Sequence, residues 1–203
     1  TLTESQIVFA EDVQEGLSAE KKHLPSKYFY DSTGDELFVK IMHCEEYYPT
    51  NAEFDILANQ SLDIMAASRF PAEAFDVIEL GAGDGLKTRQ FLSTALEAGK
   101  DITYRPIDIS AHAVNDLVGK LQTEVPDLKV EGEVGDYFNV LGKLQNSARP
   151  KLILFLGSTI GNMAFEKAVR FLSMVANFMK DEDVLLIGFD LMKDPDVIRA
   201  AYD

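Results

Sequence analysis

From Phe75 onward, short apolar runs alternate with longer amphipathic segments. The runs have the length of strands, and the segments between them carry apolar residues at helical spacing. Strands that alternate with helices form a parallel sheet, because each connection must cross from one end of the sheet to the other. The pattern therefore predicts an α/β fold with a doubly wound, Rossmann-like sheet. Its five strands are expected at FDVIEL (75–80), TYRPIDI (103–109), LKVEGEV (128–134), KLILFLG (151–157) and DVLLIGFD (183–190).

Helices are expected in three of the four connections between these strands and on either side of the five strands. Ser110 and Asn162 each stand where a side chain can cap the following helix, and Pro195 suits a first helical turn. No further strand pattern follows, so we expect the strands that close the sheet to be missing from this sequence. The expected helices cover residues 51–70, 85–99, 110–126, 164–180 and 194–203.

Composition limits the partners of the chain. Its 203 residues include 34 acidic and 19 basic ones, a net charge of −15 that repels nucleic-acid phosphates and anionic lipids. We therefore expect neither nucleic acid nor membrane as a partner, and no apolar stretch reaches the roughly 18 residues that a membrane span needs. A single cysteine, Cys44, and an N-terminus without the pattern of a secretory signal favour a cytoplasmic location.

Three glycines follow the first expected strand in ELGAGDG, at Gly81, Gly83 and Gly85. The spacing G-x-G-x-G differs from the G-x-G-x-x-G turn that holds a pyrophosphate, and a turn without Cβ atoms lets a ligand lie against the backbone. This arrangement resembles the S-adenosylmethionine (SAM) sites of class I methyltransferases. In such a site, Glu79 is expected to face the ammonium of the methionyl group and Lys87 its carboxylate.

The next strand ends carry matching chemistry. Asp108, 108 − 81 = 27 residues after the first glycine, can accept both ribose hydroxyls. Asp136 can accept the adenine amino group, and Tyr137 can offer a ring face. Each residue by itself is more often structural: Asp108 as a helix-entry residue and Asp136 as a turn residue. Their joint placement at one edge of a parallel sheet favours the SAM interpretation.

Seven motifs in order carry a family resemblance over nearly the whole chain from about Tyr28. The sequence resembles the histidine-specific SAM-dependent methyltransferases, which make Nα-trimethylhistidine in ergothioneine synthesis. One departure is Asn51, where the family commonly has arginine. The motifs are YDSTG..LF, EYYPT followed by an acidic residue, ELGAGDGLKT, PIDIS, GDY, FLGSTIGN and GFDL.KD.

The resemblance implies a role for each matching residue. Tyr47 and Asn162 are expected to hold the amine and carboxylate of the amino-acid substrate and to be the catalytic residues. Tyr202 and Tyr30 are expected in the same pocket. Residues 1–70 are expected to form a helical extension that contributes to this pocket, and residues 71–203 the SAM-binding core. The resemblance assigns the following residues to SAM: Gly81, Lys87, Asp108, Asp136 and Tyr137.

Other interpretations stay open at this point. The tyrosines of EEYYP could anchor the extension by packing, and Asn162 could be only a helix cap. A nicotinamide-dependent oxidoreductase could use the same sheet, although the glycine spacing disfavours it. A non-catalytic SAM-binding module is a further alternative.

The remaining expectations concern metals and activity. We expect no metal, because His23, His43 and His112 lack partners at ligand spacing. The resemblance places the residues that recognise imidazole beyond Asp203. The chain as given is therefore expected to bind SAM weakly or to be inactive.

Overall fold

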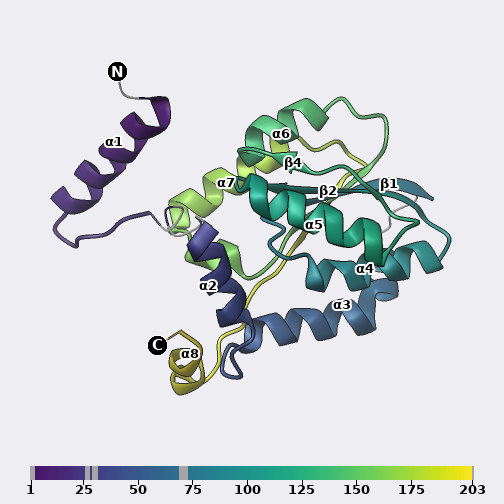
Figure 1. Cartoon of the computed structure of the whole chain (residues 1–203), viewed down its shortest axis with the longest axis horizontal. Helices are drawn as coiled ribbons and strands as arrows, with labels where there is room; N and C mark the ends of the chain where they lie inside the picture. Colours follow the sequence, from purple (N-terminus) through teal and green to yellow (C-terminus); the bar gives the residue numbers. More distant parts are fainter. Residues whose placement is uncertain (1–2, 26–27, 29–31, 69–72, 203) are drawn as a thin grey trace. The chain divides into compact units, whose positions relative to one another are not determined.

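The structure is a computed structural model that describes residues 3–25, 28, 32–68 and 73–202 (Figure 1). The chain divides into two compact units, Thr1–Phe38 and Val39–Asp203. The expected boundary at residue 70 does not coincide with this division, because helix α3 (Tyr48–Ala67) packs along α4 (Leu86–Glu97) within the second unit. The roles expected for residues 1–70 and 71–203 stay predictions.

The first unit is built on helix α1 (Glu4–Ser18), which begins at a capping box. Thr3 Oγ1 accepts from the Gln6 backbone N–H, and the Gln6 side chain accepts from the Thr3 N–H. Tyr28 ties the following segment to this helix: its hydroxyl donates to Asp12 at 2.6 Å, and its ring meets that of Phe9 edge to face. Helix α2 (Ser32–Met42) spans the boundary between the two units. Tyr30 lies outside the described residues.

The second unit contains a sheet in the order β3-β2-β1-β5-β6, with β4 also paired to β2. Every described pair is parallel, which confirms the doubly wound α/β sheet. The third expected strand is split in two, and Gly132 in the gap lies against Val114 and Val118 of the neighbouring helix. The strands are β1 Ala74–Leu80, β2 Asp101–Asp108, β3 Lys129–Val130, β4 Glu133–Val134, β5 Lys151–Phe155 and β6 Val184–Ile187.

Helices connect the successive strands. Ser110 caps α5 as expected, accepting from the Ala113 N–H at 3.2 Å. The expected cap at Asn162 is wrong: this residue ends a 3₁₀ turn, η2 (Thr159–Asn162), and Ala164 takes the N-cap position of the following helix. The sequence interpretation missed α6 altogether. These helices are α5 Ala111–Glu124, α6 Tyr137–Leu144, α7 Phe165–Asn177 and α8 Pro195–Tyr202.

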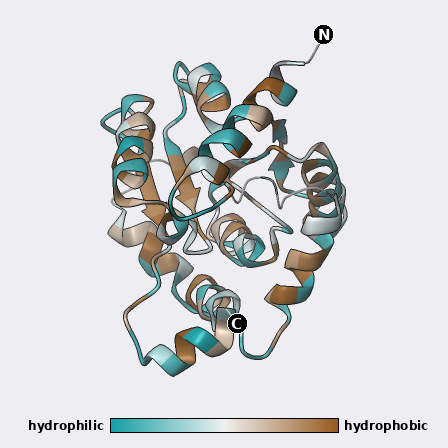
Figure 2. Cartoon of the chain, turned by 90° about the vertical axis from the view of Figure 1, so that its left-hand side faces the viewer, coloured by the Kyte–Doolittle hydropathy of each residue, from teal (hydrophilic) through white to brown (hydrophobic). Residues whose placement is uncertain are grey.

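The core has two apolar layers, one on each face of the sheet. Successive residues of a strand point to opposite faces, so Val77 joins one layer and Ile78 the other. Burial on both faces explains why β5 and β6 are mostly apolar, whereas the helices in Figure 2 have mixed colours. Among the described residues, no helix is both long and apolar enough to cross a bilayer.

The topology also determines where a crevice opens. The chain places β2 on one side of β1 and β5 on the other, so the loops that leave β1 and β5 run in opposite directions. In doubly wound sheets, ligands bind outside the carboxyl ends of the strands at such a switch point.

Candidate functional site

The glycine turn after β1 has a left-handed backbone conformation, which is energetically unfavourable for residues other than glycine. Gly81, Gly83 and Gly85 have φ angles of 76°, 56° and 66°, in the left-handed region, where a residue with a Cβ loses about 1–2 kcal/mol. A Cβ atom on Gly81 would lie 2.8 Å from the Tyr137 hydroxyl. A Cβ atom on Gly83 would have no other atom within 4 Å, and a Cβ atom on Gly85 would clash with Leu117. The turn is therefore open over Gly83, whereas the Tyr137 hydroxyl lies next to Gly81, and the missing Cβ at Gly85 lets α5 approach.

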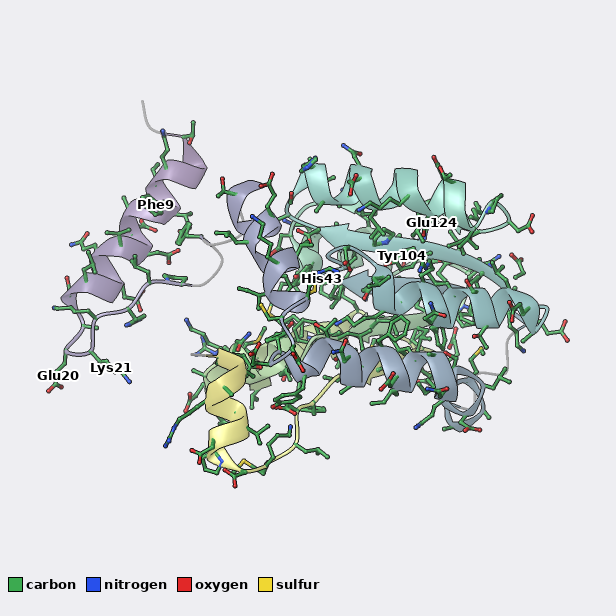
Figure 3. The ribbon with its side chains drawn as sticks, turned by 60° about the horizontal axis from the view of Figure 1, so that its bottom comes forward. Phe9, Glu20, Lys21, His43, Tyr104 and Glu124 are labelled. Carbon is green, nitrogen blue, oxygen red and sulfur yellow. The ribbon has the colours of Figure 1, made fainter. Side chains whose placement is uncertain are left out.

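Glu79, expected at the ligand's ammonium, lies inside the protein. Its carboxylate accepts from the Thr88 hydroxyl at 2.7 Å and from the Tyr104 hydroxyl, and Tyr104 lies within the sheet layer in Figure 3. Burial raises the pKa of Glu79 to about 7, although both hydrogen bonds favour the charged form. With 3% of the residue exposed and both oxygens bonded, a direct contact with ligand is disfavoured.

Lys87 lies in the crevice and has a partner that the sequence interpretation did not assign. Its Nζ is 2.5 Å from Oε2 of Glu53, and the same carboxylate accepts from the Gly157 N–H at 2.7 and 2.9 Å. The three residues come from α4, from α3 and from the loop after β5. The only signal for Glu53 in the sequence was its place as the acidic residue after EYYPT.

Of the carboxylates expected at ribose and adenine, Asp108 ends β2 and Asp136 lies shortly after β4. Asp108 is half-buried, and its Oδ1 accepts from the Ser110 N–H at 3.0 Å. Asp136 is exposed and is the N-cap of α6, because its Oδ1 accepts from the N–H groups of Phe138 and Asn139 at 3.0 and 3.3 Å. Both residues thus have a local structural role at the expected sheet edge, and their contacts with a cofactor stay predictions.

The loop after β5 contains a strained residue. Ser158 has φ 52°, and among the described residues it is the one non-glycine with a positive φ. Such strain is found preferentially at functional sites. Gly157, just before it, is also left-handed at φ 75°, and the loop continues into η2, which ends at the exposed Asn162.

Two of the expected substrate residues lie together. The rings of Tyr47 and Tyr202 meet edge to face, with centroids 5.7 Å apart. Tyr47 is 8% exposed and sits at the N-cap position of α3, whereas Tyr202 in α8 is 56% exposed. Asn162, the third expected substrate residue, lies in η2 after β5. Tyr30 is not among the described residues.

A polar cluster beside this pair was also not expected. The Tyr48 hydroxyl donates to Asp190, and Lys193 Nζ lies 4.2 Å above the Tyr48 ring and also pairs with Asp190. Burial and the hydrogen bond to Asp190 raise the pKa of Tyr48. Both partners lie in the GFDL.KD motif, so the motif was visible in the sequence but the contact was not.

A cavity of about 190 Å³ opens beside Lys87. It lies between the segment that precedes and begins α3 and the glycine turn, and its wall includes His43, Cys44, Asn51 and Asp84. A water molecule takes about 30 Å³, so the space can admit several heavy atoms of a small ligand. Within the described ranges, no three His, Cys, Asp or Glu side chains gather as metal ligands would.

Comparisons with known proteins agree with this geometry. A family model described as "Histidine-specific methyltransferase, SAM-dependent" matches residues 9–203. Histidine N-alpha-methyltransferase of Mycolicibacterium smegmatis is 38% identical over 192 residues, which cover 95% of this chain and 58% of that protein. L-tryptophan methyltransferase trpM of Psilocybe serbica is 33% identical over 200 residues, which cover 88% and 56%. This chain thus spans a little over half the length of these relatives.

A solved structure shares the fold. Magnesium protoporphyrin IX methyltransferase from Synechocystis PCC 6803, with bound SAM, superposes with a TM-score of 0.54 at 14% identity, over 99% of this chain and 85% of that one. The chain therefore shares the fold of that protein, a parallel sheet with flanking helices. Because the family model extends over nearly all of its residues, the chain belongs to the family of histidine-specific, SAM-dependent methyltransferases.

Proposed function

We propose that the protein is a SAM-dependent N-methyltransferase that acts on the α-amine of a free amino acid, L-histidine. The observation that carries this proposal is the accessible glycine turn, which lies at the switch point of the sheet between Lys87 and the carboxylates near the carboxyl ends of β2 and β4. The family and the histidine-directed name of the 38% identical relative support the substrate.

The described residues fit the shape and charge of SAM. The backbone is open over Gly83, so a ligand can lie against it. In the proposal, Lys87 binds the carboxylate of the methionyl group, Asp108 accepts from the ribose hydroxyls, and Asp136 with Tyr137 binds the adenine. When bound, SAM supplies a methyl group on a positively charged sulfur, which makes the sulfur a good leaving group.

The residues of this chain then have to present a neutral amine in line with that methyl group. Tyr47 and Asn162 are proposed to orient the substrate's amine and carboxylate, since hydroxyl and amide groups can hold an amine without a charge that would favour its ammonium form. Tyr47 and Tyr202 provide aromatic surface next to each other. Aromatic faces attract a quaternary ammonium, so this pair suits a product that gains methyl groups.

The test is methyl transfer by the full-length protein from labelled SAM to single amino acids, followed by mass spectrometry. We expect label on the α-amine of L-histidine, and a large loss of transfer in Asp108→Ala but not in the exposed control Asp55→Asn. Transfer to L-tryptophan instead of L-histidine would overturn the substrate. Binding of NADH without SAM would favour an oxidoreductase, and SAM binding without transfer to any amino acid would favour a non-catalytic module.

A further inference from the structure

The carboxylate of Glu53 lies where three strand ends meet. It contacts Lys87 in the first turn after β1 and the Gly157 N–H after β5, at 2.5 and 2.7–2.9 Å. It also lies over Gly188, directly after β6. The side chains of Lys87 and Glu53 are 16% and 15% exposed, so the pair is largely but not fully enclosed, and Lys87 also lines the cavity beside the glycine turn.

The backbone leaves room for this carboxylate. A Cβ on Gly188 would clash with Glu53 Oε1. Gly188 is not among the described glycines with a positive φ, so its backbone conformation does not itself require glycine. Glycine at position 188 therefore leaves room for the Glu53 carboxylate where it lies.

The pair keeps capacity for a ligand. The Glu53 carboxylate has about four lone-pair sites, and its contacts with Lys87 and Gly157 occupy three of them. The Lys87 ammonium group has three N–H donors, and its contact with Glu53 occupies one. A negative and a positive group side by side complement the ammonium and carboxylate of an α-amino acid. Glu79, the other carboxylate near the turn, is enclosed by Thr88 and Tyr104.

We infer that Glu53, together with Lys87, binds the amino-acid end of the methyl donor: Glu53 receives its ammonium and Lys87 its carboxylate. This inference rests on the proposed function, because it assumes that the crevice holds the donor. The competing role for Glu53 is purely structural, as a brace that holds α3 against the β5 loop. A brace would affect every ligand of the crevice alike, whereas a group that binds the ammonium affects only ligands that carry it.

Two uncharged-sulfur analogues separate these roles. S-adenosylhomocysteine has the amino-acid end, and 5′-methylthioadenosine has the same adenosine and sulfur without it. The substitution Glu53→Gln is expected to raise the Kd for S-adenosylhomocysteine by roughly ten- to hundredfold, because a hydrogen bond to a charged group is lost. Calorimetric titration measures this Kd. The Kd for 5′-methylthioadenosine is expected to stay within about twofold. Asp55→Asn removes the same charge from an exposed position of the same helix and should change neither Kd.

A second variant keeps the charge and moves it. Gly188→Ala would push the Glu53 carboxylate away, and it is expected to weaken S-adenosylhomocysteine binding selectively as well. An equal loss for both analogues in both variants, or no loss for either, overturns the inference. If the unaltered protein binds neither SAM nor S-adenosylhomocysteine, the proposed function itself fails. Selective loss in the variants of a protein that binds both supports the inference independently of turnover.

Discussion

Three carboxylates near the glycine turn have the same chemistry and very different surroundings. Glu79 is enclosed by two hydroxyl donors, Glu53 by an ammonium and a backbone N–H, and Asp108 accepts from the chain that follows it. A position after or near a strand end therefore does not tell which carboxylate faces a ligand. Whether a carboxylate is solvated, paired or buried depends on neighbours that are distant in the sequence.

Glu79 should make the stability of the fold depend on pH. Its pKa is about 7 in the folded protein, because burial disfavours its charge, against 4.5 in the unfolded chain. Between these pH values the folded state holds the proton and the unfolded state has released it, so the free energy of unfolding falls as pH rises. One pKa unit corresponds to about 1.4 kcal/mol, so the loss is about 3 kcal/mol by pH 8.

Urea unfolding of the wild-type protein and Glu79→Gln at pH 5, 6, 7 and 8 checks this. We expect the variant to gain stability relative to the wild type as pH rises, since glutamine does not ionise. Glu97→Gln, an exposed position at the end of α4, should show a constant difference. A constant difference for Glu79→Gln as well would contradict the prediction.

At the scale of elements, most helices and strands from α3 onward were predictable from the sequence. Strands β1, β2, β5 and β6 and helices α3, α4, α5 and α7 were expected and are confirmed with shifts at their ends, whereas the third expected strand is split into β3 and β4. Helix α6 was not expected, since the sequence interpretation assigned Asp136 and Tyr137, at its start, to a ligand. Asn162 has the chemistry of a cap, but the 3₁₀ turn that ends at this residue places Ala164 at the helix start.

The cap of α6 leads to a prediction that separates two roles of Asp136. Replacing it with alanine should lower the free energy of unfolding by about 1 kcal/mol, because two N–H groups of the first turn lose their acceptor. Asp136→Ser keeps a capping oxygen and should recover most of that stability. If Asp136 also binds adenine, Asp136→Ser should still weaken the binding of 5′-methylthioadenosine. Unfolding by urea and calorimetric titration of both variants measure the two effects, and equal stability of the alanine and serine variants would contradict the cap.

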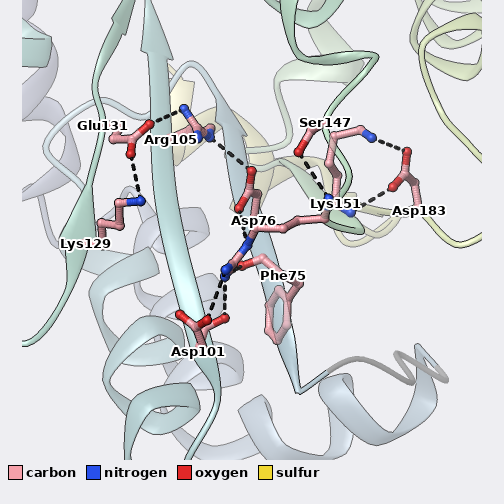
Figure 4. A network of polar contacts seen from close by, with 10 residues as sticks. Phe75, Asp76, Asp101, Arg105, Lys129, Glu131, Ser147, Lys151 and Asp183 are labelled. Carbon is pink, nitrogen blue, oxygen red and sulfur yellow. Dashed lines mark hydrogen bonds and ion pairs between the residues drawn. The ribbon is translucent and has the colours of Figure 1, made fainter.

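At the scale of the whole second unit, charges at the amino ends of the strands tie the sheet together. Asp76 of β1 receives Arg105 at 3.2 Å and Arg149 at 2.9 Å, and Lys151 lies 2.8 Å from Asp183 (Figure 4). The Lys151–Asp183 distance is that of an ion pair, although its angles are not those of a hydrogen bond. This network lies at the opposite end of the strands from the glycine turn. We therefore expect it to affect the free energy of unfolding rather than the candidate site.

Removing one member of the buried pair should be more harmful than removing both charges. Lys151→Met leaves the carboxylate of Asp183 buried without its cation, which should lower the free energy of unfolding by about 3–5 kcal/mol. The double variant Lys151→Met/Asp183→Asn should recover part of this loss, because it removes the unpaired charge.

The control is Lys120→Met, which breaks an exposed pair with Asp116 and should change stability by less than about 1 kcal/mol. Urea unfolding near pH 7 measures all three variants. A double variant no more stable than Lys151→Met alone would show that the buried charge is not the cause.

The sequence by itself determined the parallel α/β sheet, the glycine turn and the family, because apolar periodicity, glycine placement and ordered motifs are local properties of the chain. Only the tertiary structure decided that Glu79 is enclosed while Glu53 meets Lys87, and that Tyr47 meets Tyr202. These contacts join residues 34 and 155 positions apart, since 87 − 53 = 34 and 202 − 47 = 155. The energy of a charge or a ring depends on what surrounds it in space, and that surrounding exists only once the strands and helices have packed.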